Sequence, residues 1–522
     1  LCRQGREDSG LSDRLGIRTG HLYDLLRSRF PDDLERPALL VPDAAVVRYA
    51  DLDRESARYA NLIVSLGVEP GDRVAVQVDK SAQAFVLYLA CLRAGAAYLP
   101  MNVAYKDAEV AHIVGDARPR LMVCRPQNEA DLAPLCEAVG ISALRTLDAA
   151  GDGSFADEAE DCDILFETRA RGSQDLAALL YTSGTTGMPK GVMLTQENLA
   201  SNAQVLFETW GWREDDVLLH ALPLFHTHGL FVASHCALMG GTAMIFLPKF
   251  DIKQILEGLR TATVFMGVPT FYTRLLATPE FEAKSCENIR LFVSGSAPLL
   301  EQTFSEFQQR TGQDILERYG MTETGMNTSN PLDGARKLGT VGLPLDGVDV
   351  RIVDEQGEPV AADAVGQLEV KGPNVFSGYW EQPDKTAEDF TDDGYFRTGD
   401  LGRLDEDGYV VLVGRSKDLV ISGGYNVYPK EVELLIDEIP GVEESAVIGL
   451  PDADLGESVT AVIVADAAGP VPDADDIIAR LKGSLAGYKV PKRVVFYDTL
   501  PRNAMGKVQK NLLRAELSEL SG

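Results

Sequence analysis

The chain has 522 residues, of which 45% are hydrophobic and 25% are charged, so it is long enough for several domains and ordinary in composition for a globular protein. Its 79 acidic residues outnumber its 49 basic residues and give a formal net charge of −30. This balance argues against nucleic acid and anionic membranes as partners, because both require a basic surface. No apolar run approaches the roughly 20 residues that cross a bilayer, so we expect no membrane span.

The seven cysteines are scattered along the chain and include no Cys-x-x-Cys pair. This pattern is typical of reduced thiols in a cytoplasmic protein and argues against a structural zinc site. Residues 1–20 are polar and lack the apolar core of a secretory signal. We therefore predict a cytoplasmic protein whose first twenty residues form a disordered extension.

The first part of the chain alternates strands and helices. Residues 73–78 alternate apolar and polar side chains, as a strand does, and residues 81–94 carry apolar side chains at helical spacing before a stop at Gly95. Residues 96–100 then form another strand. Further strands of the same kind are predicted at residues 120–124, 217–222, 243–247 and 291–294. The pattern predicts an α/β fold with a large N-terminal domain of doubly wound, mostly parallel sheets.

The pattern changes near residue 340. Short strands separated by Gly, Asp and Pro turns predict a small β-rich subdomain over residues 340–414. These strands are expected at residues 350–353, 366–371 and 409–413. Beyond Arg415 the sequence is typical of a small α+β domain. Its predicted elements are a helix at 429–438, strands near 445–449 and 459–464, a helix at 474–485 and a strand at 493–497.

Residues 181–192 form the most distinctive loop, with three glycines, four small hydroxyl side chains and one lysine after an apolar run. Glycines let backbone N–H groups approach an anion, and the lysine supplies charge, so the loop suits a polyphosphate. It is not a Walker A loop, because Lys190 is followed by Gly191 rather than by Ser or Thr. A flexible linker is the alternative, which the ordered Met-Pro-Lys-Gly ending disfavours.

Two later segments offer carboxylates. In Tyr319–Thr324, which follows an expected strand, Glu323 provides an oxygen ligand suited to Mg²⁺ and Tyr319 provides a ring face for adenine. In Tyr395–Asp400, Asp400 follows an expected tight turn and can accept hydrogen bonds from two ribose hydroxyls. Taken alone, Glu323 is more typical of a solvated loop acid, and the Thr-Gly-Asp turn that contains Asp400 also occurs as a purely structural turn.

These segments resemble, in the same order, the signatures of the adenylate-forming superfamily of acyl-CoA synthetases, peptide-synthetase adenylation domains and luciferases. Residues 414–429 and 501–510 resemble its hinge and its C-terminal lysine motif. The resemblance implies ATP and CoA as co-substrates and Mg²⁺ as cofactor. It also implies an N-terminal domain over residues 21–414, a hinge at 415–417 and a mobile C-terminal domain over 418–522.

The resemblance also assigns roles to individual residues. The implied catalytic residues are Lys507, Thr182 and Glu323. Glu323 is also the implied metal ligand. Lys417 is the implied pivot of the hinge. The residues implied to bind ATP or CoA are Thr182, Ser183, Gly184, Thr185, Thr186, Gly187, Lys190, Gly295, Ser296, Glu317, Arg318, Tyr319, Gly320, Met321, Thr322, Asp400, Arg415, Lys417, Ser422, Gly423 and Gly424.

The implied chemistry requires such a set. A carboxylate must attack the α-phosphorus of ATP, and a mobile cation between the two anions offsets their repulsion. The thiol of CoA then attacks the acyl-adenylate, after Lys507 has left the site.

Residues 222–276 indicate which acid is used. His226 and His228 lie two positions apart with no third metal ligand spaced nearby, which disfavours zinc. Pro269 starts an expected helix, on which Arg274 lies one turn beyond Phe271 among apolar residues. Arg274 is either a surface residue whose stem covers Phe271 or the partner of a second carboxylate on the substrate.

Residues 223–330 and 423–510 resemble malonyl-CoA synthetases. The resemblance implies malonate as substrate, with Arg274 on its distal carboxylate, helped by Ser294 and by one of His226 and His228. Methylmalonate remains open, since a pocket rejects one methyl group by only about 1–3 kcal/mol. A ligase for short or medium monocarboxylates, a module that loads a carrier protein in trans and a silent nucleotide-binding regulator are the alternatives. Both a monomer and a homodimer remain open.

Overall fold

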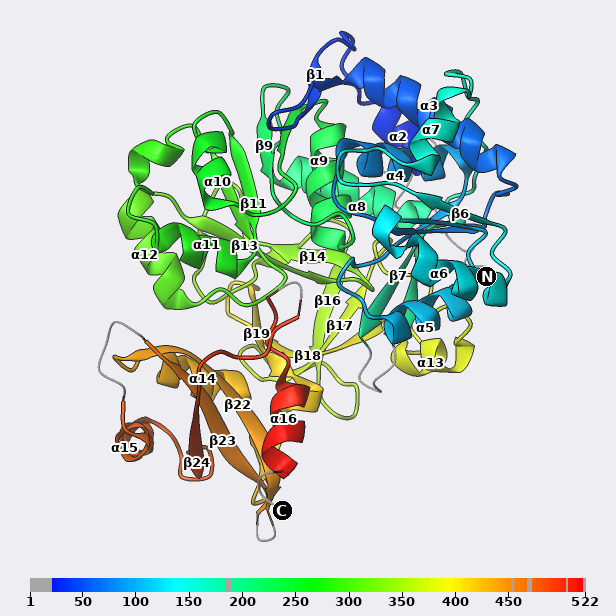
Figure 1. Cartoon of the computed structure of the whole chain (residues 1–522). Coiled ribbons are helices and arrows are strands. Elements are labelled where there is room, and N and C mark those ends of the chain that lie inside the picture. The colour runs from blue at the N-terminus through cyan, green and yellow to red at the C-terminus, as the bar shows by residue number, and fades with distance from the viewer. Residues whose placement is uncertain (1–20, 184–188, 453–454, 467–471, 504–505, 520–522) are drawn as a thin grey trace, which may run out of the picture.

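The computed structural model describes residues 21–183, 189–452, 455–466, 472–503 and 506–519, which form four sheets with helices packed against them (Figure 1). The predicted extension over residues 1–20 lies outside this part. Three sheets belong to a large upper body, and the fourth belongs to a smaller C-terminal part below it. The α/β fold class with its small β-rich and α+β parts is as predicted.

The first sheet is six-stranded, with the order β6-β5-β3-β4-β7-β8, and it is parallel except for β8. Its strands are β3 (Arg73–Gln77), β4 (Ala97–Pro100), β5 (Leu121–Cys124), β6 (Ala143–Thr146), β7 (Leu176–Ser183) and β8 (Pro189–Thr195). The crossover helix α4 (Ala82–Ala94) begins after an N-cap at Ser81 and ends at Gly95. Gly95 has a left-handed φ of 73°, which glycine adopts without the steric clash that a Cβ would cause. The predicted β-α-β unit is therefore present.

The second sheet is nine-stranded, with the order β15-β14-β13-β12-β11-β9-β10-β1-β2. It is parallel from β13 to β1 and antiparallel at both edges. Its strands are β1 (Pro37–Leu40), β2 (Val47–Arg48), β9 (Val217–His220), β10 (Ala243–Phe246), β11 (Val264–Gly267), β12 (Leu291–Ser294), β13 (Ile315–Met321), β14 (Gly325–Ser329) and β15 (Leu343–Pro344). Its central strands are buried on both faces, as strands of a doubly wound sheet are.

The helices of the large body cover these two sheets (Figure 1). Besides α4, they are α2 (Leu22–Arg27), α3 (Tyr49–Ser65), α5 (Asp107–Ala117), α6 (Glu129–Val139), α7 (Ser154–Glu160), α8 (Gln196–Thr209), α9 (Ser234–Met239), α10 (Ile252–Gly258), α11 (Pro269–Leu276), α12 (Glu301–Thr311) and α13 (Pro383–Asp389). Helix α11 begins at Pro269, as predicted, because the missing N–H of proline is not needed in a first turn.

The third sheet is antiparallel, with the order β16-β17-β18-β19, and it is the predicted β-rich subdomain. Its strands are β16 (Asp349–Val353), β17 (Gly366–Lys371), β18 (Phe396–Leu404) and β19 (Val410–Arg415). Strand β18 corrects an expectation, since Asp400 lies within this strand rather than after a tight turn. Gly399, with φ of 70°, and a register shift beyond Leu401 bend the strand at this point.

The C-terminal sheet contains β20 (Val420–Ser422), β21 (Tyr425–Val427), β22 (Val442–Asp452), β23 (Gly456–Ala465) and β24 (Arg493–Tyr497). Helices α14 (Pro429–Asp437), α15 (Ala474–Ser484) and α16 (Lys510–Glu519) pack on it. These elements match those expected, apart from the hairpin of β20 and β21. Its strands are only three residues long, too short for an alternating pattern to stand out in the sequence.

Two further properties concern the part of the chain that the structure describes. None of its helices has both the length and the apolar character that crossing a membrane requires. Its six cysteines are free, and Cys91 and Cys124 are buried in the core, as expected of small apolar side chains.

Candidate active site

The predicted phosphate loop joins two antiparallel strands. Thr182 is the second-last residue of β7 and lies opposite Lys190 on β8. Gly184, Thr185, Thr186 and Gly187 lie outside the described residues. The side chain of Lys190 is buried, with its Nζ 5.4 Å from the centroid of the Tyr379 ring. The structure thus places a hydroxyl and a buried cation side by side at the base of this loop.

Side chains from distant parts of the sequence hold the hairpin of β7 and β8. The hydroxyl of Tyr181 donates to Asp116 at 2.5 Å, and Nε2 of His112 donates to the carbonyl of Pro189 at 2.9 Å. Both partners come from α5, which precedes the loop by about 70 residues. Sequence reasoning missed them, because a single Asp or His on a helix gives no motif.

The predicted nucleotide residues meet where β13, β18 and β19 lie together. The hydroxyl of Tyr319 donates to Oδ2 of Asp400 at 2.5 Å, and Nε of Arg415 lies 2.6 Å from Oδ1. Tyr319 lies within β13 rather than after a strand, which corrects the expected placement. Because a carboxylate has about four acceptor sites, Asp400 keeps capacity for further donors.

Glu323 lies in the turn between β13 and β14, and its side chain is only 8% exposed. Burial raises its pKa, Arg415 opposes this rise, and Asp400 adds to it. A buried carboxylate of this kind is stabilised in its charged form when a cation reaches it, so the position fits a metal ligand. No group of three or more His, Cys, Asp or Glu side chains that could hold a metal occurs within the described part of the chain. The other ligands of a metal here would have to come from substrate or water.

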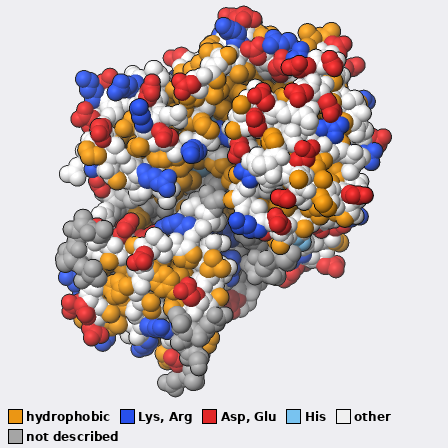
Figure 2. Space-filling view, viewed as in Figure 1, with side chains coloured by type: hydrophobic (Ala, Val, Ile, Leu, Met, Phe, Trp, Pro, Cys, Tyr) orange, Lys and Arg blue, Asp and Glu red, His pale blue; other side chains and the backbone are white. Residues whose placement is uncertain are grey.

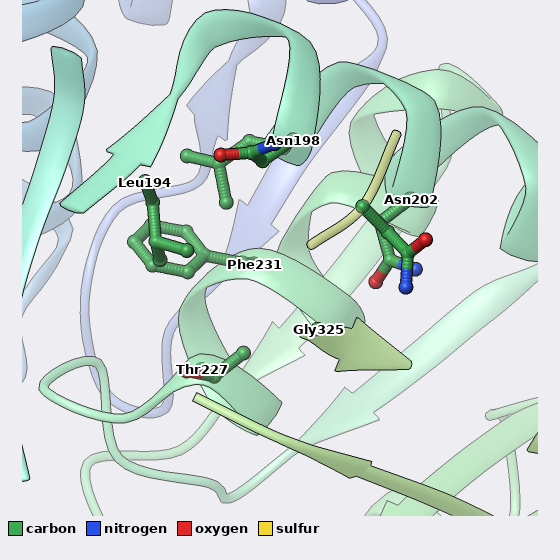
Figure 3. Close-up of a pocket in the computed structure, with 8 residues that line it drawn as sticks. Leu194, Asn198, Asn202, Thr227, Phe231 and Gly325 are labelled. Carbon is green, nitrogen blue, oxygen red and sulfur yellow. The ribbon is translucent and has the colours of Figure 1, made fainter. Parts of the chain in front are cut away.

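A small cavity beside this turn shows how the turn is held (Figure 3). Its volume is about 10 Å³, which is room for about one water and excludes a substrate. Asn202 of α8 donates to the carbonyl of Met326 at 2.9 Å, and Asn374 donates to the carbonyl of Thr324 at 2.7 Å. Gly325, with φ of 57°, leaves no space for a Cβ beside Asn202. Both asparagines therefore fix the backbone that carries Glu323, and sequence reasoning missed them too.

Unpaired polar groups converge at the ends of β12 and β13. Ser294 Oγ, His228 Nε2, and Arg318 Nε and Nη2 are buried without a hydrogen-bond partner among the described residues. The guanidinium of Arg318 packs on Gly295, where an added Cβ would lie 2.4 Å from its Cζ. Parallel strands bring their carboxyl ends to one edge of a sheet, which is where such folds bind ligands.

The two histidines belong to the same cluster. Nδ1 of His228 lies 3.2 Å from Oγ of Ser296, a residue with a left-handed φ of 71°. Burial and, to a smaller extent, the nearby charge of Arg318 together lower the pKa of His226 to about 4. Both ring systems are thus held neutral beside a buried guanidinium. Arg318, which the resemblance assigned to ATP, is therefore a neighbour of the residues assigned to the acid.

A cavity of about 300 Å³ lies between the large body and the C-terminal part. Its lining residues from the large body are Leu222, Pro223, Val268, Thr270, Phe271 and Arg274, and those from the C-terminal part are Arg502, Asn503 and Gly506. Figure 2 shows Lys and Arg side chains along the boundary between the two parts, whereas acidic side chains are spread over the outer surface. The cavity has the size of a small-molecule site, and both parts contribute to its wall.

Arg274 is the cation that the large body presents to this cavity. Its guanidinium lies over Phe250, 5.6 Å from the ring centroid, rather than over Phe271. Within the described residues it makes no ion pair with a carboxylate within 4.0 Å, and its side chain is exposed. The arginine is thus available to an anion inside the cavity.

Lys507 lies on a turn that the C-terminal part presents to the large body. Oδ1 of Asn503 accepts from the N–H of Lys507 at 3.0 Å, and Gly506 (φ 75°) faces Thr270, 3.4 Å from where a Cβ would lie. The side chain of Lys507 is exposed to solvent at the cleft between the two parts. Desolvation by the surrounding protein and, to a smaller extent, the charge of Arg415 together lower its pKa to about 8. Asp400 opposes this shift, so the lysine and the Asp400 carboxylate are electrostatic neighbours.

The hinge residues link the two parts. Ser416–Asp418 form a 3₁₀ turn after β19 in which Lys417 is exposed. Oγ of Ser416 donates to Gln367 of β17 at 2.8 Å, and Asp418 pairs with Arg514 of α16 at 2.8 Å. The residue predicted as the pivot therefore lies between an anchor to the large body and an anchor to the C-terminal part.

The Ser422–Gly424 turn connects β20 and β21 on the C-terminal part. Gly423 and Gly424 have φ of 60° and 81°, which a two-residue hairpin turn requires. The structure does not bring this turn together with the nucleotide residues described above, which come from the large body and the hinge.

Comparison with known proteins gives two family matches. The family described as AMP-binding enzyme matches residues 30–380, and the AMP-binding enzyme C-terminal domain matches residues 431–507. A malonate–CoA ligase from Arabidopsis thaliana is 37% identical over 484 residues, which cover 86% of this chain and 78% of that protein. A feruloyl-CoA synthase from an Amycolatopsis species is also 37% identical, over 491 residues that cover 92% and 97% of the two chains.

The ATP-bound crystal structure of MatB from Rhodopseudomonas palustris is 51% identical and matches with a TM-score of 0.94, over 97% of this chain and 100% of that one. The apo structure of the same protein matches over the same shares with a TM-score of 0.83. Since the two sequences compared are the same, the difference reflects conformation. The present arrangement is thus more similar to the ATP-bound structure.

Proposed function

Because the chain belongs to the AMP-binding, adenylate-forming enzyme family and is an acyl-CoA ligase, we propose that its acid substrate is malonate. In this proposal malonate, ATP and CoA yield malonyl-CoA, AMP and pyrophosphate through an acyl-adenylate. The observation that carries the proposal is Arg274, an arginine without a carboxylate partner on the wall of a cavity of about 300 Å³. A planar guanidinium can bind a carboxylate through two parallel hydrogen bonds.

The charge balance around the cavity supports an anionic substrate. The protein carries a net charge of −30, yet Arg274 and the buried Arg318 both lack a carboxylate within 4.0 Å in the described residues. Ser294 and His228 add polar atoms without partners next to Arg318. A monocarboxylate would leave both cations without an anion once its carboxylate has turned towards ATP, whereas the distal carboxylate of malonate can pair with one of them.

The adenylation step can be assigned to the residues at the domain boundary. Asp400 accepts from the ribose hydroxyls, with Tyr319 and Arg415 fixing its orientation. Lys507 faces this carboxylate and approaches the two reacting anions, where its charge offsets their repulsion as bonds form at phosphorus. Lys190 and Thr182 face the departing phosphates. Glu323 would hold Mg²⁺, which would neutralise charge on the leaving pyrophosphate when bound.

The thioester step requires a different arrangement. The Lys507 turn forms a wall of the acid cavity, so it occupies space through which a thiol would have to pass. We assign Lys417 as the pivot that withdraws this turn, and Gly423 and Gly424 as the turn that then lines the CoA channel. The sulfur of CoA attacks the acyl carbon, AMP leaves, and the thiol proton passes to solvent or a base.

The Arabidopsis thaliana and Amycolatopsis relatives are equally identical to this chain, and their names give different acids. Methylmalonate differs from malonate by one methyl group, so its use as a slower substrate is part of the proposal. The free cysteines of the described residues support a reducing compartment such as the cytoplasm.

The test measures AMP formation with ATP and CoA across acetate, malonate, methylmalonate, succinate and hexanoate. We expect malonate to give the highest kcat/KM. A higher value for acetate or hexanoate would contradict the role of Arg274 and support a monocarboxylate ligase. Formation of AMP that requires a carrier protein and does not respond to free CoA would instead indicate a loading module.

A further inference from the structure

Lys80 is an enclosed lysine that the reaction described above does not use. It follows β3 in the large body, and its Nζ lies 2.8 Å from Nδ1 of His220, 2.8 Å from the carbonyl of His220 and 2.9 Å from the carbonyl of Leu222. It also lies 4.3 Å from the centroid of the Phe246 ring. An ammonium has three donors, and these three acceptors satisfy all of them. Within the described residues no carboxylate lies within 4.0 Å of it.

This geometry fixes the state of His220. The carbonyl of Gly229 can only accept, so Nε2 of His220 carries the ring proton, and Nδ1 of the neutral ring accepts from Lys80. Nε2 lies 2.9 Å from the carbonyl of Gly229 and 3.1 Å from Oγ of Ser234, and the carbonyl can only accept. Burial and the charge of Lys80 lower the pKa of His220, which keeps the ring neutral. A continuous chain of hydrogen bonds therefore runs from Lys80 through His220 to Gly229.

The two ends of this chain hold the two ends of one segment. Residues 222–229 begin at the carbonyl that Lys80 binds and end at the carbonyl that His220 binds. The segment folds back on itself so tightly that a Cβ on Gly229 would lie 2.1 Å from the carbonyl oxygen of Pro223. Leu222 and Pro223 line the cavity of about 300 Å³, and His226 and His228 lie in the polar cluster beside Arg318.

We propose that Lys80 and His220 form a positioning pair that holds the 222–229 segment in place and thereby sets the affinity and selectivity for the acid. This inference rests on the proposed function only in assigning the cavity to the acid substrate, whichever acid that is. Neither residue touches the reacting atoms. Their effect is transmitted through the wall that Leu222 and Pro223 present to the cavity.

The choice of a lysine has an electrostatic consequence. Two backbone carbonyls and a ring nitrogen can be satisfied by neutral donors, whereas an enclosed ammonium without a carboxylate partner has a cost of desolvation. Burial accordingly lowers the pKa of Lys80 well below its usual value. The hydrogen bonds of Lys80 to the carbonyls of His220 and Leu222, rather than its charge, therefore carry the proposal.

The test replaces Lys80 with methionine, which keeps the length of the side chain and removes its donors and charge. Lys284→Met, at an exposed position of the large body, is the matched control. For wild type and both variants, KM and kcat are measured for the preferred acid and for ATP, together with the malonate-to-acetate ratio of kcat/KM and hydrogen exchange of residues 222–229. We expect K80M to raise KM for the acid by about 10- to 100-fold, as a displacement of about 1 Å in a binding wall does. KM for ATP should change less than threefold, and exchange should accelerate in this segment.

An equal rise of KM for the acid and for ATP, or unchanged kinetics with only a lowered Tm, would overturn the proposal, since either result describes a general structural role. If K80M does not fold, His220→Asn tests the same chain of hydrogen bonds, because it releases Gly229 and leaves Lys80 on its two carbonyls. If wild type prefers a monocarboxylate, the proposed substrate is wrong. The positioning role still stands or falls with the effect of K80M on KM for that monocarboxylate.

Discussion

Replacing Arg274, whose guanidinium lies over Phe250, with methionine should remove the proposed partner of the substrate's distal carboxylate while keeping an apolar stem at this position. Two unit charges about 4 Å apart interact by about 4 kcal/mol at the effective dielectric constant of a protein surface. Arg274 is exposed on the wall of its cavity, so solvent reduces this value, and we take about 2–3 kcal/mol. The expected loss in kcat/KM for malonate is therefore about 30- to 150-fold.

The assay compares malonate with propionate, which resembles malonate in size but lacks the second charge. We expect R274M to lower kcat/KM for malonate and to leave the value for propionate unchanged or raised, so that the ratio of the two changes by the full factor. Arg260→Met, at an exposed position after α10, is the matched control and should behave as wild type. Arg274→Lys should recover part of the loss, because it restores the charge without the two-pronged geometry.

Two results would refute the reasoning. If R274M lowered both acids equally, Arg274 would support the cavity wall rather than bind a carboxylate. If R274M left the enzyme's best substrate untouched while malonate stayed poor in every variant, the enzyme would be a monocarboxylate ligase, and the distal-carboxylate role would be wrong.

The variant K507M removes the charge of Lys507 and should slow adenylation by about 10²–10³-fold, as measured by exchange of labelled pyrophosphate into ATP. Thioester formation from supplied acyl-adenylate should stay within a few-fold of wild type. The lysine must be protonated to act, and its pKa is lowered to about 8, so kcat/KM for adenylation should fall as pH rises through about 8. The variant K507R stays charged at this pH and should not show the fall. A pH profile that K507R leaves unchanged would contradict the assignment. Asp400→Asn should raise KM for ATP at least tenfold with little effect on KM for the acid, and equal effects on both would argue against ribose binding. Glu323→Gln should shift the Mg²⁺ concentration for half-maximal rate upward by about tenfold or more, and an unchanged metal dependence would remove Glu323 from the metal site.

The alternation of strands and helices was sufficient to predict the parallel sheets, because each buried strand is a continuous apolar run and each crossover helix carries its own start and stop. Helix α4, between Ser81 and Gly95, is the clearest case. Strand β18 was missed because its residues alternate poorly and include Gly399, whose positive φ bends the strand. Local patterns describe regular elements well and bent ones poorly.

The candidate site divides in the same way. Residues in contiguous motifs, such as Glu323 and Asp400, could be proposed from the sequence because several motifs occurred in a fixed order. The residues that hold them could not. Asn202 and Asn374 reach the Glu323 turn from other elements, and each is a common polar side chain in an unremarkable segment. Such contacts span more than 40 residues of sequence, and only the fold brings them together.

The proposed two-step reaction would require the two parts to move relative to one another. In the present conformation the cavity proposed for the acid is closed on one side by Arg502, Asn503 and Gly506, so the turn that carries Lys507 is also a wall of the cavity. In the proposed mechanism, this turn would obstruct the approach of a thiol for as long as it holds the lysine near the Asp400 carboxylate.

In the proposed mechanism, a rotation about Lys417 would remove both the charge and the wall in one motion. Ser416 is bonded to Gln367 in the large body and Asp418 to Arg514 in the C-terminal part, so Lys417 is the residue between two anchors at which the backbone angles would change. The higher TM-score against ATP-bound than against apo MatB, 0.94 against 0.83, is consistent with an arrangement suited to the first half-reaction. Replacing Lys417 with proline should therefore impair the thioester step more than adenylation, because a fixed φ at the pivot holds the closed form.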